Sequence, residues 1–320
     1  MYLDQRLLPH EITYVRARSI DEFEAAIKTL AVRGAPCIGV FGGYATALLR
    51  TRTADEVVLS AAIARLRAAR PTAANLAWAV DRVAAAADAL GEADAIAREQ
   101  LAVDNAIAGH GLELIPKGAR ILTHCNTGPL ATGGSGTALG VIIAAQRAGK
   151  KPHVFVDETR PLLQGSRLNM LELRQAGVDA VLQADAAAAT AMARRHVDLV
   201  LVGADRIARN GDTANKVGTY GLAILAAHHG IPFYVAAPRS TFDPSIAAGD
   251  GIPIEERADD EVTSFGGARV APTGTAVYNP AFDVTPGHLI TAFVTECGIV
   301  RPPYGESIPA LDLRPLITAR

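Results

Sequence analysis

Two side chains that can do chemistry, a thiol and a carboxylate, each follow a short apolar run. Cys125 directly follows the stretch Ile121–His124, and Asp205 comes shortly after the run Leu199–Val202. Short apolar runs of this kind, bounded by turn residues, are typical of buried strands. In open α/β sheets, ligands bind in the crevice at the carboxyl ends of the strands. We therefore expect the thiol and the carboxylate to lie at one edge of a sheet and to form a reaction centre.

Each of these residues also has a purely structural interpretation. A cysteine by itself is more often a small buried hydrophobe, although donors at a helix N-terminus would favour a reactive thiolate. His124 alternates away from Cys125 if the strand continues that far, so it need not be the base of the thiol. Asp205 can cap the next helix or pair with Arg206. A buried Asp205 that stays neutral would instead suit a proton donor.

The loop after Cys125 is rich in glycine, with Gly133, Gly134 and Gly136 close together. It nearly matches the phosphate loop of nucleotide hydrolases, but Gly134 stands where that loop requires lysine. The spacing for dinucleotide binding is also missed, by one residue. Two interpretations stay open: main-chain amides that approach an anionic ligand beside a helix N-terminus, or a tight turn that only packs.

Basic residues stand near three predicted helix starts. In Arg33–Pro36 the proline suits the first helical turn, and the free amides beside it can hold an anion. Arg70 precedes another helix, and Asn215–Lys216 opens a third. Arginine binds phosphate through paired hydrogen bonds and lysine binds it as a point charge, so the set indicates a phosphate ligand. Any one of them alone is usually a solvated surface residue. Gln164 can donate to and accept from a sugar hydroxyl, or simply tie its loop.

The elements that position these residues change character near residue 115. Residues 1–115 are mostly helical in pattern, with a capping box at Ser19 and Glu22. From residue 116 apolar runs alternate with helices, which predicts right-handed crossovers and a parallel sheet covered on both faces. We predict an α/β protein with a small N-terminal domain (1–115) and a parallel-sheet C-terminal domain (116–320). The predicted strands are Arg120–His124, His153–Asp157, Ala180–Gln183, Leu199–Gly203, Phe233–Ala236 and Leu289–Val294, with short strands within Tyr2–Val15. In the N-terminal part we predict one helix that ends near Leu30, a second that follows Pro36, a third over Ala54–Ala69 and a fourth that starts at Pro71. In the C-terminal part the predicted helices are Thr137–Ala148, Gly165–Ala176 and Lys216–His228. The segment Gly249–Pro272 is polar and is predicted to leave the core pattern.

The bulk composition excludes several classes of protein. The 320 residues carry a net charge of -2, which gives no electrostatic footprint for nucleic acid or anionic membranes. No apolar run approaches the roughly 20 residues that cross a bilayer, and no signal peptide is evident. Cys37, Cys125 and Cys297 are far apart and show no zinc-site spacing. We expect reduced thiols in the cytoplasm, and neither a membrane nor a nucleic-acid partner.

Many ordered stretches of the chain together resemble the methylthioribose-1-phosphate isomerase family of sugar-phosphate isomerases, which is related to regulatory subunits of a translation-initiation exchange factor. The resemblance extends from Leu3–Gln5 to Pro302–Pro303. Its motifs are Ala31–Pro36, Arg70–Trp78, Thr123–Gly128, Asp157–Leu168, Gly203–Ile207, Asn210–Asp212, Asn215–Tyr220, Ile231–Pro238, Ile252–Arg257 and Asn279–Pro286. One departure is Ser135, where family members commonly have an aromatic residue.

The resemblance implies a Rossmann-like C-terminal domain, a homodimer, and no metal or cofactor. It implies that Cys125 and Asp205 are the catalytic pair. The remaining implied site residues bind the substrate: Arg33, Gly34, Ala35, Arg70 and Lys216 hold the phosphate, and Gln164 and Asn215 hold sugar hydroxyls.

The implied reaction converts 5-methylthioribose 1-phosphate to 5-methylthioribulose 1-phosphate in methionine salvage. Asp205 would protonate the ring oxygen, and the hydrogen would move from C2 to C1 either through a Cys125 thiolate or as a hydride. The alternatives are an isomerase of ribose 1,5-bisphosphate or 5-deoxyribose 1-phosphate, and a non-catalytic subunit that only binds sugar phosphates.

Overall fold

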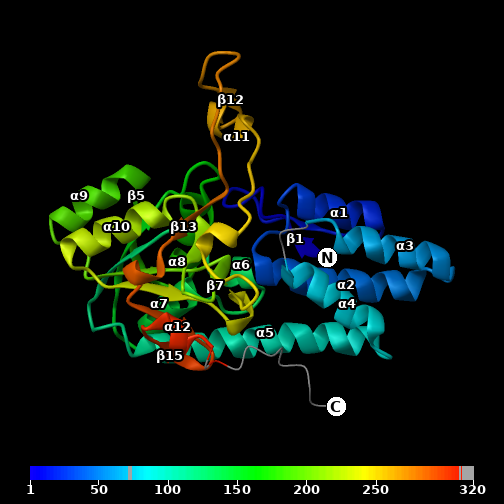
Figure 1. Ribbon diagram of the computed structural model, residues 1–320. Coiled ribbons are helices and arrows are strands. Elements are labelled where there is room, and N and C mark those ends of the chain that lie inside the picture. The colour runs from blue at the N-terminus through cyan, green and yellow to red at the C-terminus, as the bar shows by residue number, and fades with distance from the viewer. Residues whose placement is uncertain (71–73, 310, 312–320) are drawn as a thin grey trace. The chain divides into compact units, whose positions relative to one another are not determined.

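The computed structural model describes residues 1–70, 74–309 and 311 (Figure 1). The chain divides into two compact units. The first unit consists of residues 1–105 and 126–136, and the second unit consists of residues 106–125 and 137–320. Helix α5 (Ala89–Leu112) begins in the first unit and ends in the second. Within the described ranges, no helix is both long enough and apolar enough to cross a membrane.

The first unit is mostly helical, as the sequence predicts. Its first helix starts at the predicted capping box, in which Ser19 and Glu22 bond each other's main-chain amides. The predicted start of the fourth helix at Pro71 lies outside the described residues. The elements of this unit are β1 (Tyr2–Leu3) and β2 (Tyr14–Val15), which pair antiparallel, and α1 (Ile20–Lys28), α2 (Ala35–Arg52), α3 (Glu56–Arg67), α4 (Ala74–Ala85), the first part of α5, and α6 (Pro129–Thr132).

Helices α2 and α4 of the first unit pack very closely because α2 presents glycines to α4. A Cβ atom on Gly39 would lie 3.0 Å from the main-chain oxygen of Asn75, and one on Gly42 would lie 2.5 Å from a methyl group of Leu76. Ile38 and Leu76 are buried in the core that surrounds this contact. The close contact fixes the amino end of α2, where the sequence Arg33–Ala35 lies.

A seven-stranded sheet forms the centre of the second unit. Its order is β15-β14-β9-β6-β3-β4-β5, and every neighbouring pair except β14 with β15 is parallel. The predicted strands are confirmed to within a few residues. The six predicted strands are β3 (Arg120–Thr123), β4 (His153–Asp157), β5 (Asp179–Gln183), β6 (Leu199–Val202), β9 (Phe233–Ala236) and β14 (Ala292–Thr295). The edge strand β15 (Gly298–Val300) was not predicted.

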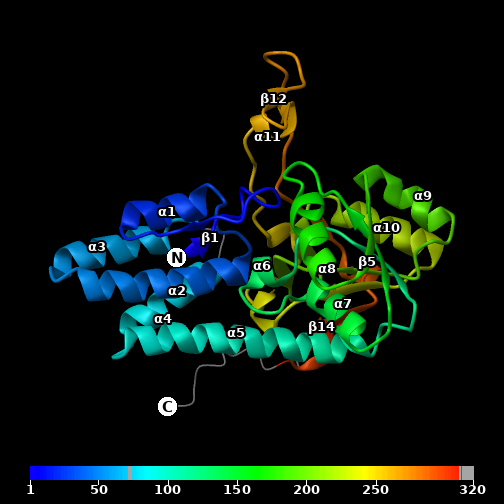
Figure 2. The same cartoon turned by 180° about the vertical axis from the view of Figure 1, so that it is seen from behind.

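The strand order reverses between β3 and β6. The chain runs outward from β3 through β4 to β5, then returns to β6 on the other side of β3 and continues to β9 and β14. Helices α9 and α10 cover one face of the sheet in Figure 1, and α7 and α8 cover the opposite face in Figure 2. A reversal of this kind is the topological switch point at which doubly wound sheets bind ligands. The helices are α7 (Ala138–Arg147), a π-helical turn Gly165–Asn169, α8 (Met170–Gln175), α9 (Ala188–Ala193) and α10 (Thr219–His229).

A second, four-stranded sheet follows β6 and was not predicted. Its order is β10-β7-β8-β13, with β7 (Arg206–Ala208), β8 (Thr213–Lys216), β10 (Phe242–Asp243) and β13 (Phe282–Thr285). The prediction that Asn215–Lys216 opens a helix is wrong, because both residues lie in β8 and helix α10 begins only at Thr219. Strand β8 forms instead because it pairs antiparallel with both β7 and β13.

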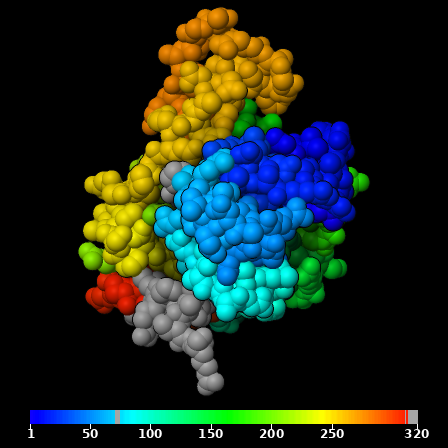
Figure 3. Space-filling model, turned by 90° about the vertical axis from the view of Figure 1, so that its right-hand side faces the viewer, coloured from blue at the N-terminus to red at the C-terminus, as the bar shows by residue number. Residues whose placement is uncertain are grey.

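An arm projects from the body of the second unit, drawn in orange in Figures 1 and 3. It contains a two-stranded antiparallel hairpin, which lies within the predicted excursion Gly249–Pro272. The remaining short elements of this unit are α11 (Asp260–Thr263), β11 (Ser264–Phe265) and β12 (Ala268–Arg269) in the arm, the 3-10 turns Asp185–Ala187, Arg239–Thr241, Gly249–Gly251 and Gly287–Leu289, and α12 (Tyr304–Ser307).

Candidate active site

The thiol at the end of β3 is buried and is held in a strained conformation. Cys125 is 7% exposed, and its φ of +60° lies in the left-handed region that residues with a side chain rarely adopt. Its amide donates to Thr159 Oγ1 at 2.9 Å, and its carbonyl accepts from Asn169 Nδ2 at 2.8 Å. Strain of this kind persists only where the surroundings enforce it, and it concentrates at functional sites. The surroundings therefore fix Cys125 in place.

The loop that follows β4 supplies this support and is itself strained. Thr159 has a φ of +65° and Leu163 a φ of +59°. The amides of Thr159 and Arg160 both donate to the carboxylate of Asp185, each at 2.7 Å. The Thr159 hydroxyl, which accepts from Cys125, donates in turn to the main-chain oxygen of Asp157 at 3.1 Å. The ends of β3 and β4 are thus joined by a continuous set of hydrogen bonds.

Gln164 closes this loop with a buried polar atom that has no hydrogen-bond partner among the described residues. The residue is 6% exposed, and no described residue makes a hydrogen bond to its Oε1. Leaving such an atom unpaired costs about 1–3 kcal/mol. The π-helical turn Gly165–Asn169 comes directly after it, and π-helical turns frequently mark functional sites. A ligand hydroxyl would satisfy Oε1, as the sequence interpretation of Gln164 requires.

The carboxylate after β6 differs from the thiol in being exposed. Asp205 lies between β6 and β7, and its amide donates to Ala214 O at 2.9 Å, beside Asn215. Burial, the condition under which Asp205 would suit a proton donor, is therefore not met. Capping of a following helix is also wrong, because a strand follows. Arg206, the other expected partner, forms an ion pair with Asp243 at 2.7 Å.

Asn215 and Lys216 are buried in β8, at 3% and 8% exposure. Asn215 Nδ2 donates to Thr219 Oγ1 at 3.0 Å, at the start of α10. Lys216 Nζ donates to Ala281 O at 2.7 Å and lies 4.9 Å from the ring centroid of Phe282. The carbonyl and the aromatic face beside this ammonium are both groups that favour a cation.

His124, which the sequence argument set aside, forms a buried network beside the thiol. Its Nδ1 lies 3.1 Å from Asp157 Oδ2, and its Nε2 lies 2.9 Å from Val217 O. Burial alone would lower the pKa of His124, but its hydrogen bond to Asp157 and the charges of Asp157 and Asp185 outweigh burial and raise the pKa above its ordinary value. The only signal for His124 in the sequence was the strand alternation that points it away from Cys125. That alternation did not indicate which residues His124 would contact.

The same three residues are close enough to be considered as metal ligands. Single ligand atoms of His124, Asp157 and Asp185 all lie within 4.8 Å of one another. Both ring nitrogens of His124 and both carboxylate oxygens of Asp185 already face protein groups. The cluster is therefore a hydrogen-bond network among protein groups, which needs no ion to satisfy it.

The first unit carries the sequence Arg33–Ala35 at the start of α2. Arg33 Nη1 donates to Asn126 Oδ1 at 2.8 Å. Gly34 is the N-cap residue and offers no side-chain cap to the helix amides. Its φ is +90°, and a Cβ atom there would lie 2.2 Å from Ala131 O, so only glycine fits. A helix start with uncapped amides and a neighbouring guanidinium is suited to an anion.

Arg70 also belongs to the first unit and is half-buried. It was expected at a helix start, but residues 71–73 lie outside the described residues, and α4 is described from Ala74. The predicted substrate-binding residues are thus divided between the units: Arg33, Gly34, Ala35 and Arg70 lie in the first, and Gln164, Asn215 and Lys216 lie in the second with Cys125 and Asp205.

At residues 135–136 of the glycine-rich loop, the structure supports a tight turn that only packs, and not a set of amides that bind an anionic ligand. The buried carboxylate of Asp104 accepts from the amides of Ser135 and Gly136, both at 2.9 Å. The Ser135 hydroxyl donates to Asn105 Oδ1 at 2.7 Å. These two amides are occupied by a carboxylate of the first unit itself, so they are not a preformed anion site.

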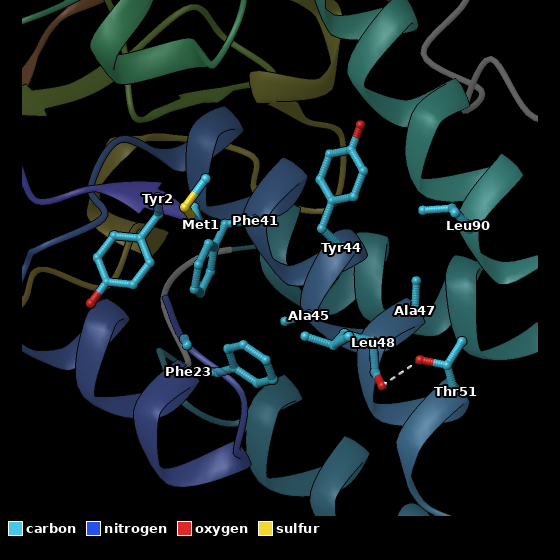
Figure 4. Close-up of a pocket in the computed structure, with 11 residues that line it drawn as sticks. Met1, Tyr2, Phe23, Phe41, Tyr44, Ala45, Ala47, Leu48, Thr51 and Leu90 are labelled. Carbon is cyan, nitrogen blue, oxygen red and sulfur yellow. Dashed lines mark hydrogen bonds between the residues drawn. The ribbon is translucent and has the colours of Figure 1, made fainter. Parts of the chain in front are cut away.

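The first unit also contains an apolar cavity of about 440 Å³ (Figure 4). Tyr2, Phe23 and Phe41 meet edge to face along it, with ring centroids 5.5 and 6.0 Å apart. Among the described residues that line it, none is an arginine or a lysine. A phosphate would have no cationic side chain there, so this cavity is not the predicted sugar-phosphate site.

Comparisons with known proteins agree on one family. The sequence profile of the initiation factor 2 subunit family matches residues 31–302. A curated methylthioribose-1-phosphate isomerase from Desulforudis audaxviator is 52% identical over 323 residues, which cover 96% of this chain and 93% of that protein. One from Thermus thermophilus is 52% identical over 310 residues, with 96% and 92% covered. The chain belongs to the initiation factor 2 subunit family, in its methylthioribose-1-phosphate isomerase branch.

Solved structures of this family have the same fold. The 5-methylthioribose 1-phosphate isomerase from Pyrococcus horikoshii matches with a TM-score of 0.89 and 40% identity, covering 96% of this chain and 91% of that one. A protein from A. fulgidus described as translation initiation factor eIF-2B, subunit delta, matches with a TM-score of 0.87 and 42% identity, covering 96% and 95%. The resemblance inferred from the motifs is confirmed. The two solved structures are thus described in different terms, one as an isomerase and one as an initiation-factor subunit.

Proposed function

We propose that this protein is an aldose-ketose isomerase that converts 5-methylthioribose 1-phosphate to 5-methylthioribulose 1-phosphate in methionine salvage. The observation that carries the proposal is the strained, clamped thiol of Cys125 at the switch point of the sheet. Asp205 follows the neighbouring strand, β6. Relatives that are 52% identical over 96% of the chain have the corresponding enzyme name, which supports the same conclusion.

The proposed roles of Cys125 and Asp205 follow from the chemistry of the substrate. Its phosphate occupies the anomeric oxygen, so the ring cannot open as an ordinary hemiacetal. We assign Asp205 as the acid that protonates the ring oxygen while the ring breaks. The hydrogen then moves from C2 to C1, with Cys125 either removing the C2 proton as a thiolate or stabilising a direct hydride shift. Because Asp205 is exposed here, the bound substrate must exclude water from it before it acts as a strong acid.

The substrate-binding residues follow the donors that each side chain offers. We assign the phosphate to Arg33, Arg70 and Lys216 and to the helix start at Gly34 and Ala35. Lys216 would bind the phosphate as a point charge, beside its hydrogen bond to Ala281 O. The sugar hydroxyls fall to Gln164, through its buried Oε1, and to Asn215.

The organisation of the protein is part of the same proposal. We infer two domains, a small helical one over residues 1–115 and a Rossmann-like catalytic one over residues 116–320. The order of the parallel strands supports the second assignment, since it matches the doubly wound order. We further propose that the protein is a cytoplasmic homodimer. We also propose that it requires no metal or cofactor, because protonation and hydrogen transfer in this reaction need only side chains.

The test is turnover of the purified protein in deuterated solvent. Ketose formation from 5-methylthioribose 1-phosphate is followed by carbon NMR, with the Cys125→Ser variant as the control. Turnover by the parent and loss in the variant are expected. Deuterium at C1 of the product would indicate proton transfer through a side chain, and its absence would indicate a hydride shift or a shielded proton. Equal turnover by parent and variant would remove Cys125 from the mechanism.

A non-catalytic, sugar-phosphate-binding subunit is the second candidate, favoured by the structural match that is described as an initiation-factor subunit. The same preparation distinguishes the two. Binding of 5-methylthioribose 1-phosphate in calorimetry without ketose formation would support the second candidate. Turnover of ribose 1,5-bisphosphate or 5-deoxyribose 1-phosphate at a higher kcat/KM would instead change the substrate while keeping the reaction class.

A further inference from the structure

Three segments of the second unit meet at a single buried side chain, that of His124. The ring nitrogens of His124 face Asp157 Oδ2 at 3.1 Å and Val217 O at 2.9 Å. Each contacted residue lies close in sequence to a proposed site residue. His124 precedes Cys125, Val217 follows Lys216, and Asp157 begins the strained loop that ends at Gln164. The imidazole therefore connects the three segments that carry the proposed site of this unit.

The hydrogen bonds of this ring restrict its protonation. A main-chain carbonyl can only accept, so Nε2 must carry a hydrogen toward Val217 O. Nδ1 faces a carboxylate whose other oxygen, Oδ1, accepts from Gln183 Nε2 at 2.9 Å. One more proton therefore lies between Nδ1 and Asp157. With Asp157 ionised, the ring is an imidazolium that donates from both nitrogens.

Among the described residues, the charged side chains that interact electrostatically with the His124 ring are all acidic. Asp157 and Asp185 face it from the end of β4 and from the turn after β5, and Asp283 faces it from β13. Asp283 in turn accepts from the amides of Gly218 and Tyr220 at 2.7 and 3.1 Å, at the start of α10. The hydrogen bond to Asp157 and the charges of Asp157 and Asp185 raise the pKa of His124, and burial raises the pKa values of Asp157 and Asp283 as well.

The chain is shaped to let this ring reach Val217. Gly218 has a φ of +107°, and a Cβ atom there would lie 3.0 Å from His124 Cε1 and 3.1 Å from His124 Nε2. A side chain at this position would therefore push the ring off the carbonyl. The glycine serves the contact with His124 as well as the turn into α10.

We propose that His124 is a positioning residue of the isomerase, whose two hydrogen bonds hold the Cys125, Gln164 and Lys216 segments in register. This inference rests on the proposed function of that site. The ring touches no substrate atom in this role. It acts through its neighbours, by fixing where the thiol, the amide and the ammonium stand before the substrate binds. Misplacement of reacting groups by about 1 Å can cost on the order of a hundredfold in rate.

Four variants at the two side chains separate positioning from simple folding. Asp157→Asn keeps both hydrogen bonds of the ring, because the new amide can donate to a neutral Nδ1 while its oxygen still accepts from Gln183. His124→Gln keeps at most one of the two bonds. His124→Phe keeps neither, and Asp157→Leu removes the partner but leaves the ring. Every variant is compared with the parent per active site, counted by iodoacetamide alkylation of the peptide that contains Cys125, since the exposed Cys297 is also a free thiol.

The kcat of each variant is expected to fall with the number of hydrogen bonds that the residue at position 124 loses. Asp157→Asn retains kcat within about threefold, His124→Gln and Asp157→Leu lose about tenfold, and His124→Phe loses about a hundredfold, with smaller changes in KM. In the parent, kcat falls at high pH as the His124–Asp157 pair loses its shared proton. This fall moves to higher pH in Asp157→Asn, whose bonds do not need that proton. A merely structural role would lower the melting temperature and the number of active sites without this pH shift.

Two outcomes would overturn the proposal. One is a His124→Phe variant that keeps kcat per active site within threefold of the parent. The other is an Asp157→Asn variant that loses as much activity as His124→Phe. Nitrogen NMR of histidine-labelled protein tests the protonation without any turnover: a ring of His124 with only one protonated nitrogen at neutral pH, and a neutral Asp157, would refute the imidazolium. If the parent itself fails to turn over, the proposed function fails, whereas the NMR result still decides the state of the pair.

Discussion

The carboxyl ends of β3 and β6 lie side by side in the sheet, yet they hold their reactive groups in opposite ways. At the end of β3, Cys125 is buried, strained at a φ of +60° and bonded through both main-chain groups. At the end of β6, Asp205 is exposed and has a regular main-chain bond to Ala214. One group is fixed by the folded protein before any ligand arrives, and the other remains in contact with solvent.

The difference teaches how each group is prepared for reaction. Fixing a thiol against an unfavourable backbone conformation costs stability, but it removes the need to order the group during the reaction. An exposed carboxyl costs nothing in the folded chain and becomes a useful acid only after water is removed from it. The thiol end is therefore expected to respond to stability measurements, and the carboxylate end only to kinetic ones.

The largest expected effect breaks the chemistry at the carboxylate end without disturbing the fold. Asp205→Asn should lower kcat by about 10²–10⁴-fold, the range of general acid catalysis, because the amide cannot give up a proton. The melting temperature should stay that of the parent, since the side chain is exposed. Steady-state kinetics and calorimetry check both parts. Asp250→Asn, at another exposed aspartate, is the matched control and should change neither.

The next effect sharpens the comparison at the thiol end. Cys125→Gly and Cys125→Ala both remove the thiol and should both be inactive. Only alanine keeps a side chain at a φ of +60°, so the glycine variant should be more stable than the alanine variant by more than about 1 kcal/mol. Urea unfolding with equal m-values measures the difference. Glycine that is equal to or less stable than alanine would show that the site stores no backbone strain at Cys125.

A smaller effect concerns Gln164, which belongs to the fixed part of the site. Gln164→Met has a similar volume and removes the unpartnered Oε1, so it should leave stability unchanged or raise it by about 1 kcal/mol. The KM for 5-methylthioribose 1-phosphate should rise, because the hydroxyl of the substrate loses its partner. Thermal unfolding and initial-rate kinetics are measured on the same preparation. A drop in stability with an unchanged KM would assign Gln164 to the fold instead of the ligand.

The parts of this arrangement that the sequence predicts are those with a local pattern. Strands such as β4 and β9 were placed to the residue because short apolar runs that are bounded by turn residues and alternate with helices indicate buried strands. The placement of both reactive groups at the carboxyl ends of strands followed, since both come shortly after such runs. The capping box at Ser19 is equally local and was equally predictable.

The parts that were missed depend on partners far away in the sequence. Asn215–Lys216 has the local pattern of a helix start, but β13 provides a pairing edge that Thr213–Lys216 joins. His124 and Asp104 are buried because Asp157, Val217 and the loop amides of Ser135 and Gly136 satisfy them. No window of a single sequence contains both members of these pairs.

The smallest expected effect lies at the opposite ends of the same two strands. Arg120 at the start of β3 and Asp198 before β6 form an exposed ion pair, with Nη2 and Oδ1 2.5 Å apart. The hydrogen bond from Arg120 holds the pKa of Asp198 below its ordinary value. The contribution of this pair is therefore present above the unfolded-state pKa of aspartate and is lost as the pH falls through the lower folded-state value.

Asp198→Asn should accordingly lower stability near neutral pH by less than about 1 kcal/mol, as exposed pairs do, and by less in high salt. The difference from the parent should shrink toward zero in acid, where Asp198 is protonated in both the folded and the unfolded chain. The kcat should not change, because both residues lie at the amino ends of the strands, away from the switch point. Urea unfolding at several pH values measures the first effect and initial rates the second. A large loss of kcat in this variant would mean that the relative position of β3 and β6, and not only the residues at their carboxyl ends, determines the rate.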